Sequence, residues 1–248
     1  MIRDLLALCR SIGIYRLRPG HQASLRKLYT PLIKPGGLVF DVGAHVGDRT
    51  VCFKSLGARV VAIEPQALFA RFLSLTHKAN PNVTVLRGVV CRTPGRQTLY
   101  VNSRNPTVST VSDGFVQAAH AGDPSWQGQQ WDRQIEVDAF SLDALIAEHG
   151  VPDFIKIDVE GAEHEVLQSL SEPVGAVSFE FTLIQRDLAH DCLERCQALG
   201  MTKFNASLGE SHEWVFGDWQ DIESIKDWID QLPASANSGD IYARLPKK

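Results

Sequence analysis

The sequence has no long hydrophobic run and no cysteine pattern typical of disulfides or zinc, and each absence excludes a class of protein. No apolar stretch approaches the ~20 residues that a membrane-spanning helix needs. The start MIRDLLALCRSIG holds five apolar residues between Asp4 and Arg10, too few for the apolar core of a signal peptide. The five cysteines show neither CxxC nor Cys/His metal spacing. We therefore expect a reducing, cytoplasmic setting.

The chain also lacks an excess of positive charge, which excludes an electrostatic case for nucleic-acid binding. Its formal net charge is -4. One local exception is Met1 to Lys34, where seven Lys or Arg accompany a single acid, Asp4. This stretch could contact an anionic membrane surface or a partner, or join two copies in a homodimer. A solvated helix face is the simpler interpretation.

Strands and helices alternate along most of the sequence, which predicts an α/β fold. Short β-branched runs from Leu38 onward, such as LVFDV, RVVAI and DFIKIDV, are separated by helical patterns. Near-continuous hydrophobic strands of this kind indicate a doubly wound, mostly parallel, Rossmann-like sheet covered on both faces. After Met201 we expect the strands TKFNAS, HEWVF and DIYARL to complete that sheet. The predicted organisation is a helical extension, residues 1–35, and one domain, residues 36–248.

The stretch LVFDVGAHVGD predicts a ligand site, because it joins a buried strand to a glycine turn and a helix. Ligands of doubly wound sheets bind beyond the carboxyl ends of the strands. Gly43 and Gly47 allow positive φ and close backbone approach. The next strand ends at Glu64, whose carboxylate can accept both hydroxyls of a ribose. The pattern therefore favours an adenosine-type ligand.

The charge of the turn decides which adenosine-type ligand is favoured. A dinucleotide fingerprint requires G-x-G-x-x-G, but His45 replaces its second glycine and Asp41 would face the diphosphate. A carboxylate there is unfavourable beside a diphosphate and favourable beside the amino and sulfonium groups of S-adenosylmethionine. The sequence contains no P-loop. An NAD-type oxidoreductase and a catalytically silent nucleoside-binding protein are the alternatives.

A longer motif in the second half carries a resemblance to a known family. The run PDFIKIDVEGAEHEVLQSL, together with TVSTVS, SFEF, FNASLGES and GDIYARL, resembles the FkbM family of class I S-adenosylmethionine-dependent methyltransferases. The likeness extends from about Gly36 to Leu245. It implies a seven-stranded sheet whose last strand is antiparallel. It also implies methyl transfer to an oxygen of a small molecule, a sugar or a lipid-linked acceptor, leaving S-adenosylhomocysteine as the product.

The resemblance also implies which residues hold the methyl donor. Those that would line its methionine part are Asp41, Gly43, Ala44 and Gly47. Glu64 would bind the ribose, and Gly88 and Val89 would lie near the adenine. His45 stands where asparagine is expected, and its ring could contact the methionine part or lie on the surface.

Charged residues in IKIDVEG predict where the chemistry takes place. Strand alternation would place Lys156, Asp158 and Glu160 on one face, with Lys156 paired to Asp158 or to Glu180 of SFEF. The candidate general bases are Asp158, Glu160, Glu180 and His164, and Asp158 is preferred because its strand should neighbour the glycine-turn strand. Alternatively, the three carboxylates could hold a divalent cation that acidifies the acceptor hydroxyl.

We expect the methyl acceptor to be bound by residues in loops. Residues 102–133 are rich in Gly, Ser, Asn, Pro and Gln around two tryptophans, a composition that suits a lid or a passive insertion. Further candidate pocket elements are STVS (Ser109 to Ser112), FNASLGE (Phe204 to Glu210) and Trp214.

Overall fold

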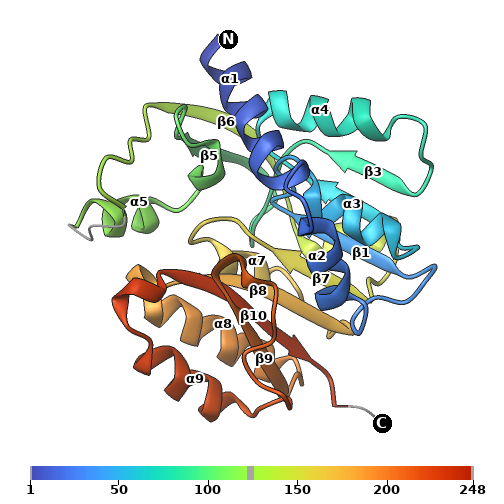
Figure 1. Cartoon of the computed structure of the whole chain (residues 1–248), viewed down its shortest axis with the longest axis vertical. Coiled ribbons are helices and arrows are strands. Elements are labelled where there is room, and N and C mark those ends of the chain that lie inside the picture. The colour runs from blue at the N-terminus through green and yellow to red at the C-terminus, as the bar shows by residue number, and fades with distance from the viewer. Residues whose placement is uncertain (1, 122–125, 247–248) are drawn as a thin grey trace.

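The computed structural model describes residues 2–121 and 126–246, and its main sheet has seven strands (Figure 1). These strands are β1 (Leu38–Val42), β2 (Arg59–Ile63), β3 (Val83–Leu86), β7 (Phe154–Ile157), β8 (Ala176–Thr182), β9 (Lys203–Leu208) and β10 (Ser238–Arg244). Their order is β3-β2-β1-β7-β8-β10-β9, and β10 is antiparallel to both of its neighbours. The other pairs are parallel. The predicted doubly wound sheet with an antiparallel last strand is confirmed.

Helices cover both faces of this sheet, as the apolar strands require. The α-helices are α1 (Ile2–Ser11), α2 (His21–Tyr29), α3 (Asp48–Ser55), α4 (Ala67–His77), α5 (Asp113–His120), α6 (Leu142–His149), α7 (Glu163–Gln168), α8 (Arg186–Ala198) and α9 (Ile222–Gln231). Alternate residues of one strand face opposite helix layers: Phe40 packs with residues of α6 to α9, and Val39 packs with α2 and α3. None of the described helices is long and apolar enough to cross a bilayer.

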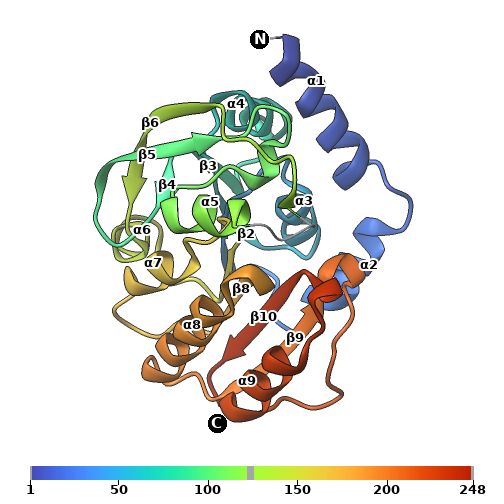
Figure 2. The ribbon, with the colours of Figure 1, turned by 90° about the vertical axis from the view of Figure 1, so that its left-hand side faces the viewer.

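A second, three-stranded sheet stands beside the first (Figure 2). It consists of β4 (Val89–Val90), β5 (Gly95–Val101) and β6 (Arg133–Phe140), in the order β4-β6-β5. The segment 102–133, which was predicted as a loop, connects the antiparallel strands β5 and β6. It contains α5 and the short helix η2 (Pro106–Val108), while residues 122–125 lie outside the described residues.

One predicted strand is wrong. HEWVF, residues 212–216, is fully described and forms no strand. His212 has a φ of 53°, which turns the backbone out of the extended region directly after η5 (Gly209–Ser211). The segment is held instead by single bonds, one of them from the Val215 N–H to the Ala206 carbonyl.

Candidate active site

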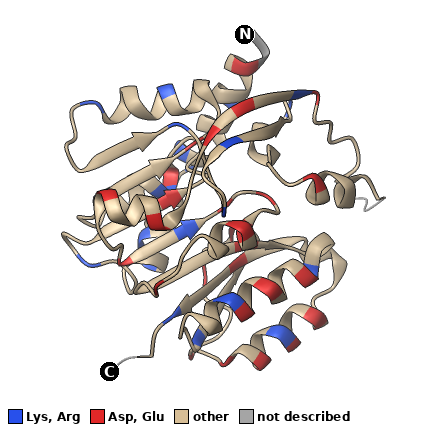
Figure 3. Ribbon diagram, turned by 180° about the vertical axis from the view of Figure 1, so that it is seen from behind, with Lys and Arg blue, Asp and Glu red and all other residues tan. Residues whose placement is uncertain are grey.

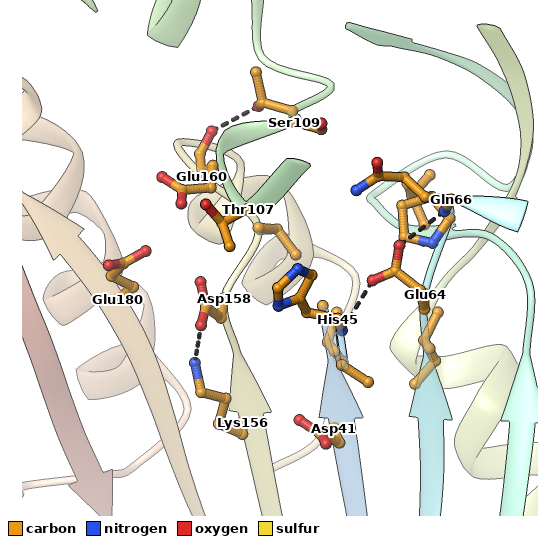
Figure 4. Close-up of a pocket in the computed structure, with 18 of the residues that line it drawn as sticks. Asp41, His45, Glu64, Gln66, Thr107, Ser109, Lys156, Asp158, Glu160 and Glu180 are labelled. Carbon is orange, nitrogen blue, oxygen red and sulfur yellow. Dashed lines mark hydrogen bonds and ion pairs between the residues drawn. The ribbon is translucent and has the colours of Figure 1, made fainter. Parts of the chain in front are cut away.

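A cavity opens where strands β1, β2, β7 and β8 end, the place predicted for a ligand (Figure 4). Seven residues predicted to bind the donor line it: Asp41, Gly43, Ala44, His45, Glu64, Gly88 and Val89. Three predicted catalytic residues also line it: Asp158, Glu160 and Glu180. Glu64 lies on one side of His45 and the carboxylates of Asp158 and Glu180 lie on the other. One cavity therefore contains both halves of the predicted site.

Asp41, near the end of β1, is a buried carboxylate at the floor of the cavity. It is 1% exposed, and its Oδ2 accepts a hydrogen bond from the Thr50 hydroxyl at 2.5 Å. Burial raises its pKa to about 6, although the Thr50 hydrogen bond and the nearby Lys156 act in the opposite direction. A cationic ligand would favour the ionised form of this carboxylate.

Glu64 directly follows β2, and backbone hydrogen bonds fix its position. Oε2 accepts the His45 N–H at 2.9 Å, and Oε1 accepts the Gln66 N–H at 2.8 Å. The residue is 3% exposed, and burial raises its pKa to about 7 in spite of these bonds. Each carboxylate oxygen can accept a further hydrogen bond, so the group retains acceptor capacity for two ribose hydroxyls.

The glycine turn has a packing role that the sequence did not reveal. Gly43 has a φ of 83°, and a Cβ placed there would lie 1.8 Å from the Asp158 carbonyl oxygen. The glycine is thus required where β1 approaches the end of β7, besides lining the cavity. Gly47 has a φ of 74°, and its Cβ would meet the Leu73 side chain at 2.4 Å. Gly47 is absent from the described residues that line the cavity, because its place is against α4.

His45 is a cavity residue rather than a surface residue. Its φ is 48°, a left-handed conformation that asparagine and histidine tolerate better than most residues. The ring stacks on Phe69 at 4.7 Å between centroids and meets Tyr15 edge-on at 5.6 Å. Burial lowers its pKa to about 4, so the ring is neutral near pH 7. Its buried Nε2 has no hydrogen-bond partner among the described residues.

Carboxylates gather at the other side of the cavity. Ligand oxygens of Asp158, Glu160 and Glu180 lie within 4.8 Å of one another. Lys156, only 2% exposed, contacts Asp158 at 2.5 Å and Asp240 at 3.9 Å, so its predicted pairing with Asp158 is confirmed. Strand β7 ends at Ile157 and Glu160 has a φ of 57°, so strand alternation does not extend to Glu160. A left-handed turn brings it to the cavity instead.

The pKa values of these carboxylates are shifted in opposite directions from their ordinary values. Burial would raise the pKa of Asp158, but the cations of Lys156 and Arg49 hold it below its ordinary value. Burial and the neighbouring carboxylates raise the pKa values of Glu160 and Glu180 well above the ordinary value. Asp158 is therefore the first carboxylate of the cluster to ionise as the pH rises, and the two glutamates keep their protons to higher pH.

Tyr15 and Arg49 line the cavity although they were not predicted, and Arg49 on α3 is the more informative of the two. Its guanidinium donates to Asp48 at 2.6 Å and to Glu210 at 3.2 Å. Its buried Nε has no partner within the described part of the chain. Tyr15, from the N-terminal extension, lines the same cavity, and so does Glu210, the last residue of the predicted pocket element Phe204 to Glu210. Arg49 is placed to meet a carboxylate such as that of a bound amino acid.

Other predicted residues lie elsewhere. His164 is not among the described residues that line the cavity; it lies on α7, where its Nε2 is 2.9 Å from the side-chain nitrogen of Gln168. Trp214 packs against Tyr242 at 4.8 Å between ring centroids. From the segment 102–133, Thr107, Ser109 and Thr110 line the cavity, and the Thr110 hydroxyl donates to the Glu160 carbonyl at 2.6 Å.

The sequence profile described as "Methyltransferase FkbM domain" matches residues 41–226, which include both groups of cavity residues. The chain belongs to the FkbM methyltransferase family. S-adenosylmethionine is the methyl donor of this family, and it fits the cavity of this FkbM methyltransferase. The buried carboxylates of Asp41 and Glu64 suit its cationic and ribose groups, and the free Nε of Arg49 suits its carboxylate.

Solved structures of other methyltransferases resemble this FkbM methyltransferase at low identity. A FkbM methyltransferase from Methylobacillus flagellatus KT is 13% identical with a TM-score of 0.48, and the match covers 98% of this chain and 59% of that one. An O-methyltransferase from Bacillus cereus in complex with SAH is 12% identical with a TM-score of 0.47, covering 99% and 91%. A precorrin-6y C5,15-methyltransferase from Geobacter metallireducens GS-15 is 11% identical with a TM-score of 0.45, covering 91% and 87%. No curated protein matches the sequence significantly.

Proposed function

We propose that this methyltransferase transfers the methyl group of S-adenosylmethionine to a hydroxyl oxygen of a small-molecule, sugar or lipid-linked acceptor. The observation that carries the proposal is the cluster of Asp158, Glu160 and Glu180 within 4.8 Å, in the same cavity as Glu64. A hydroxyl is a weak nucleophile that must lose its proton during transfer, so it needs a base beside the reacting oxygen. A neutral amine acceptor can attack without one.

The cavity residues have different roles in the proposed reaction. S-adenosylmethionine supplies a methyl carbon that its sulfonium already activates. Glu64 and Asp41 hold the donor, so that the acceptor oxygen can approach in line with the bond that breaks. Asp158, kept ionised by Lys156, accepts the hydrogen bond of the acceptor hydroxyl. The proton released from that hydroxyl enters the carboxylate cluster, which titrates as a unit.

A divalent cation on the same three carboxylates is the second candidate mechanism, because their ligand oxygens lie close enough together to share an ion. Such an ion would lower the pKa of the bound acceptor hydroxyl. Lys156 already supplies positive charge to Asp158, which favours the direct mechanism. We also propose a reducing, cytoplasmic setting, which is supported by five cysteines that are all free thiols.

Segment 102–133 is proposed as the element that closes over the acceptor. Five of its residues, Thr107, Ser109 and Thr110 among them, line the cavity, and the Trp131 indole N–H donates to the Val108 carbonyl at 2.8 Å. Phe115 and Trp126 pack edge-on at 5.0 Å within the same segment. These contacts give the segment a small apolar core of its own, which supports a lid that moves as a unit.

The function is tested by combining thermal shift with a transfer assay. S-adenosylmethionine and S-adenosylhomocysteine should each stabilise the protein by ~2.7 kcal/mol at a concentration of 100 Kd, and NAD should not. A donor labelled in its methyl group, incubated with a panel of alcohols and sugars, should then yield an O-methyl product. Stabilisation by NAD would favour an oxidoreductase. A labelled N-methyl or C-methyl product would exclude the proposed acceptor class.

Turnover should rise with pH, because the proton released by the acceptor enters the carboxylate cluster, which accepts it more readily once Glu160 and Glu180 have lost their own protons. The pKa values of Glu160 and Glu180 are raised, so both are protonated below their raised pKa and lose protons only above it. The rate should therefore be low in acid and increase about tenfold per pH unit until the cluster is ionised. Glu180→Gln removes one neighbouring carboxylate and should move this rise to lower pH. Profiles of kcat for both proteins test this, and superimposable profiles would contradict it.

A further inference from the structure

Exposed apolar side chains are concentrated on the N-terminal helices. Seven large hydrophobic residues are exposed in the described part of the chain, and four of them are Leu5, Leu6, Ile14 and Leu17. Leu17 is 72% exposed, the highest value of the seven. The other three are scattered singly along the rest of the chain, as is normal for soluble proteins. A concentration of this kind marks an interaction surface.

These residues lie on one continuous helical stretch at the edge of the molecule (Figure 2). α1 continues directly into the π-helix η1 (Ile12–Arg16). Its inner side is buried, with Leu8 packed against Val46 and Phe69. Its outer side carries Leu6, Gly13 and Leu17, which are exposed and recur at helical spacing.

The N-terminal stretch that carries this surface is strongly basic. Residues 1–34 hold seven Lys or Arg and one acid, whereas the rest of the chain holds 18 basic and 28 acidic residues. The exposed basic residues of this stretch are Arg10, Arg18, Arg26, Lys27 and Lys34. On α8 and α9, by contrast, acidic and basic residues are mixed (Figure 3). The apolar surface is therefore combined with a basic extension on an otherwise acidic protein.

We propose that the outer side of α1 and η1 binds an anionic lipid surface. Leu6, Ile14 and Leu17 insert among the headgroups, and exposed basic side chains such as Arg18, next to Leu17, bind the lipid phosphates. Interfacial helices combine these two features, an apolar side and basic residues that attract anionic lipids. A second copy of the chain fits this surface less well, because a two-fold contact would place one basic extension against another.

Binding through α1 and η1 would hold the cavity next to the lipid surface. The role given to that arrangement rests on the proposed function. Tyr15 lies on η1 between Ile14 and Leu17 and lines the cavity. A neighbouring groove of about 330 Å³ lies beneath α1, and its lining includes Leu5, Phe69 and Ile135. It shares Gln66 and Pro106 with the cavity. A protein held by α1 would therefore be placed to methylate the head of a lipid-linked acceptor.

Flotation with vesicles tests the surface without donor, acceptor or turnover. The probes are vesicles of phosphatidylcholine alone and of phosphatidylcholine with phosphatidylglycerol. The full chain should bind the anionic vesicles at least about tenfold more tightly, and high salt should weaken that binding. The double variant Leu6→Glu, Leu17→Glu should lose binding about tenfold or more. Leu75→Glu, which alters an equally exposed leucine on α4, should keep it.

Other results would overturn the proposal. These are equal affinity for both vesicle types, unchanged binding by the double variant, or equal loss in Leu75→Glu. A dimer in sedimentation that only the double variant dissociates, without vesicle binding, would assign the surface to self-association. Stabilisation of each variant by S-adenosylhomocysteine checks that the fold is intact. Because flotation does not depend on methyl transfer, its failure would leave the proposed reaction standing, and failure of the reaction would leave the lipid surface standing.

Discussion

Asp158→Asn should lower turnover on the order of 10²–10⁴-fold while changing donor affinity much less. The substitution keeps the size and polarity of the side chain but removes its charge. Asp158 lies in the carboxylate cluster and is held ionised by Lys156 at 2.5 Å, so its charge is available to the acceptor hydroxyl. Single-turnover kinetics with an acceptor identified in the transfer assay, together with calorimetry of donor binding, separate the two effects.

Asp240→Asn provides a matched control for this prediction. Asp240 also faces Lys156, at 3.9 Å, but it is not among the described residues that line the cavity. A much smaller loss in Asp240→Asn would show that Asp158 acts on the acceptor rather than only as a partner for Lys156. A chelator should leave the wild type active under the direct mechanism. Activity abolished by the chelator and restored by magnesium or manganese would assign the cluster to a cation. Full activity in Asp158→Asn would reject both mechanisms.

Glu64→Ala should weaken donor binding on the order of tenfold to a hundredfold. The change removes charge-assisted hydrogen bonds worth ~1.5–3 kcal/mol between the carboxylate and the ribose hydroxyls. It also leaves the His45 and Gln66 N–H groups without their acceptor, so folding must be checked by circular dichroism. Glu64→Gln, which keeps the shape and one acceptor oxygen, should lose less. Unchanged affinity by calorimetry in a folded Glu64→Ala protein would remove Glu64 from the donor site.

The site residues at the ends of strands could be predicted, because the local sequence pattern shows where each strand ends. Asp41, Glu64 and Asp158 each lie at or directly after the end of a buried parallel strand. Parallel strands of one sheet end at the same edge, so the order β2-β1-β7 brings these three carboxylates into one cavity. Alternating strands and helices are a local pattern, and that pattern was sufficient to predict both the edge and the residues on it.

Residues that depend on contacts between distant segments could not be predicted. Tyr15 reaches the cavity from the N-terminal extension, and nothing in its own neighbourhood indicates this. The sequence contains one weak indication for Arg49. This residue stands in the first turn of the helix that follows the glycine turn, so its cation is placed near a ligand bound at that turn. His45 lies in the glycine turn, and its ring is enclosed by Phe69 of α4 and Tyr15 of η1. Gly47 followed the motif but turns toward Leu73, because packing against α4 determines its place.

A crystal structure with S-adenosylhomocysteine tests the arrangement of the site most directly. The ribose hydroxyls should donate to Glu64, the carboxylate should lie near Arg49, and the sulfur should face Asp158 across His45. The position of the missing methyl group would then point into the cluster of Asp158, Glu160 and Glu180. Adenosine bound among those carboxylates, or a sulfur facing away from Asp158, would contradict the proposed division of the cavity into donor and acceptor sides.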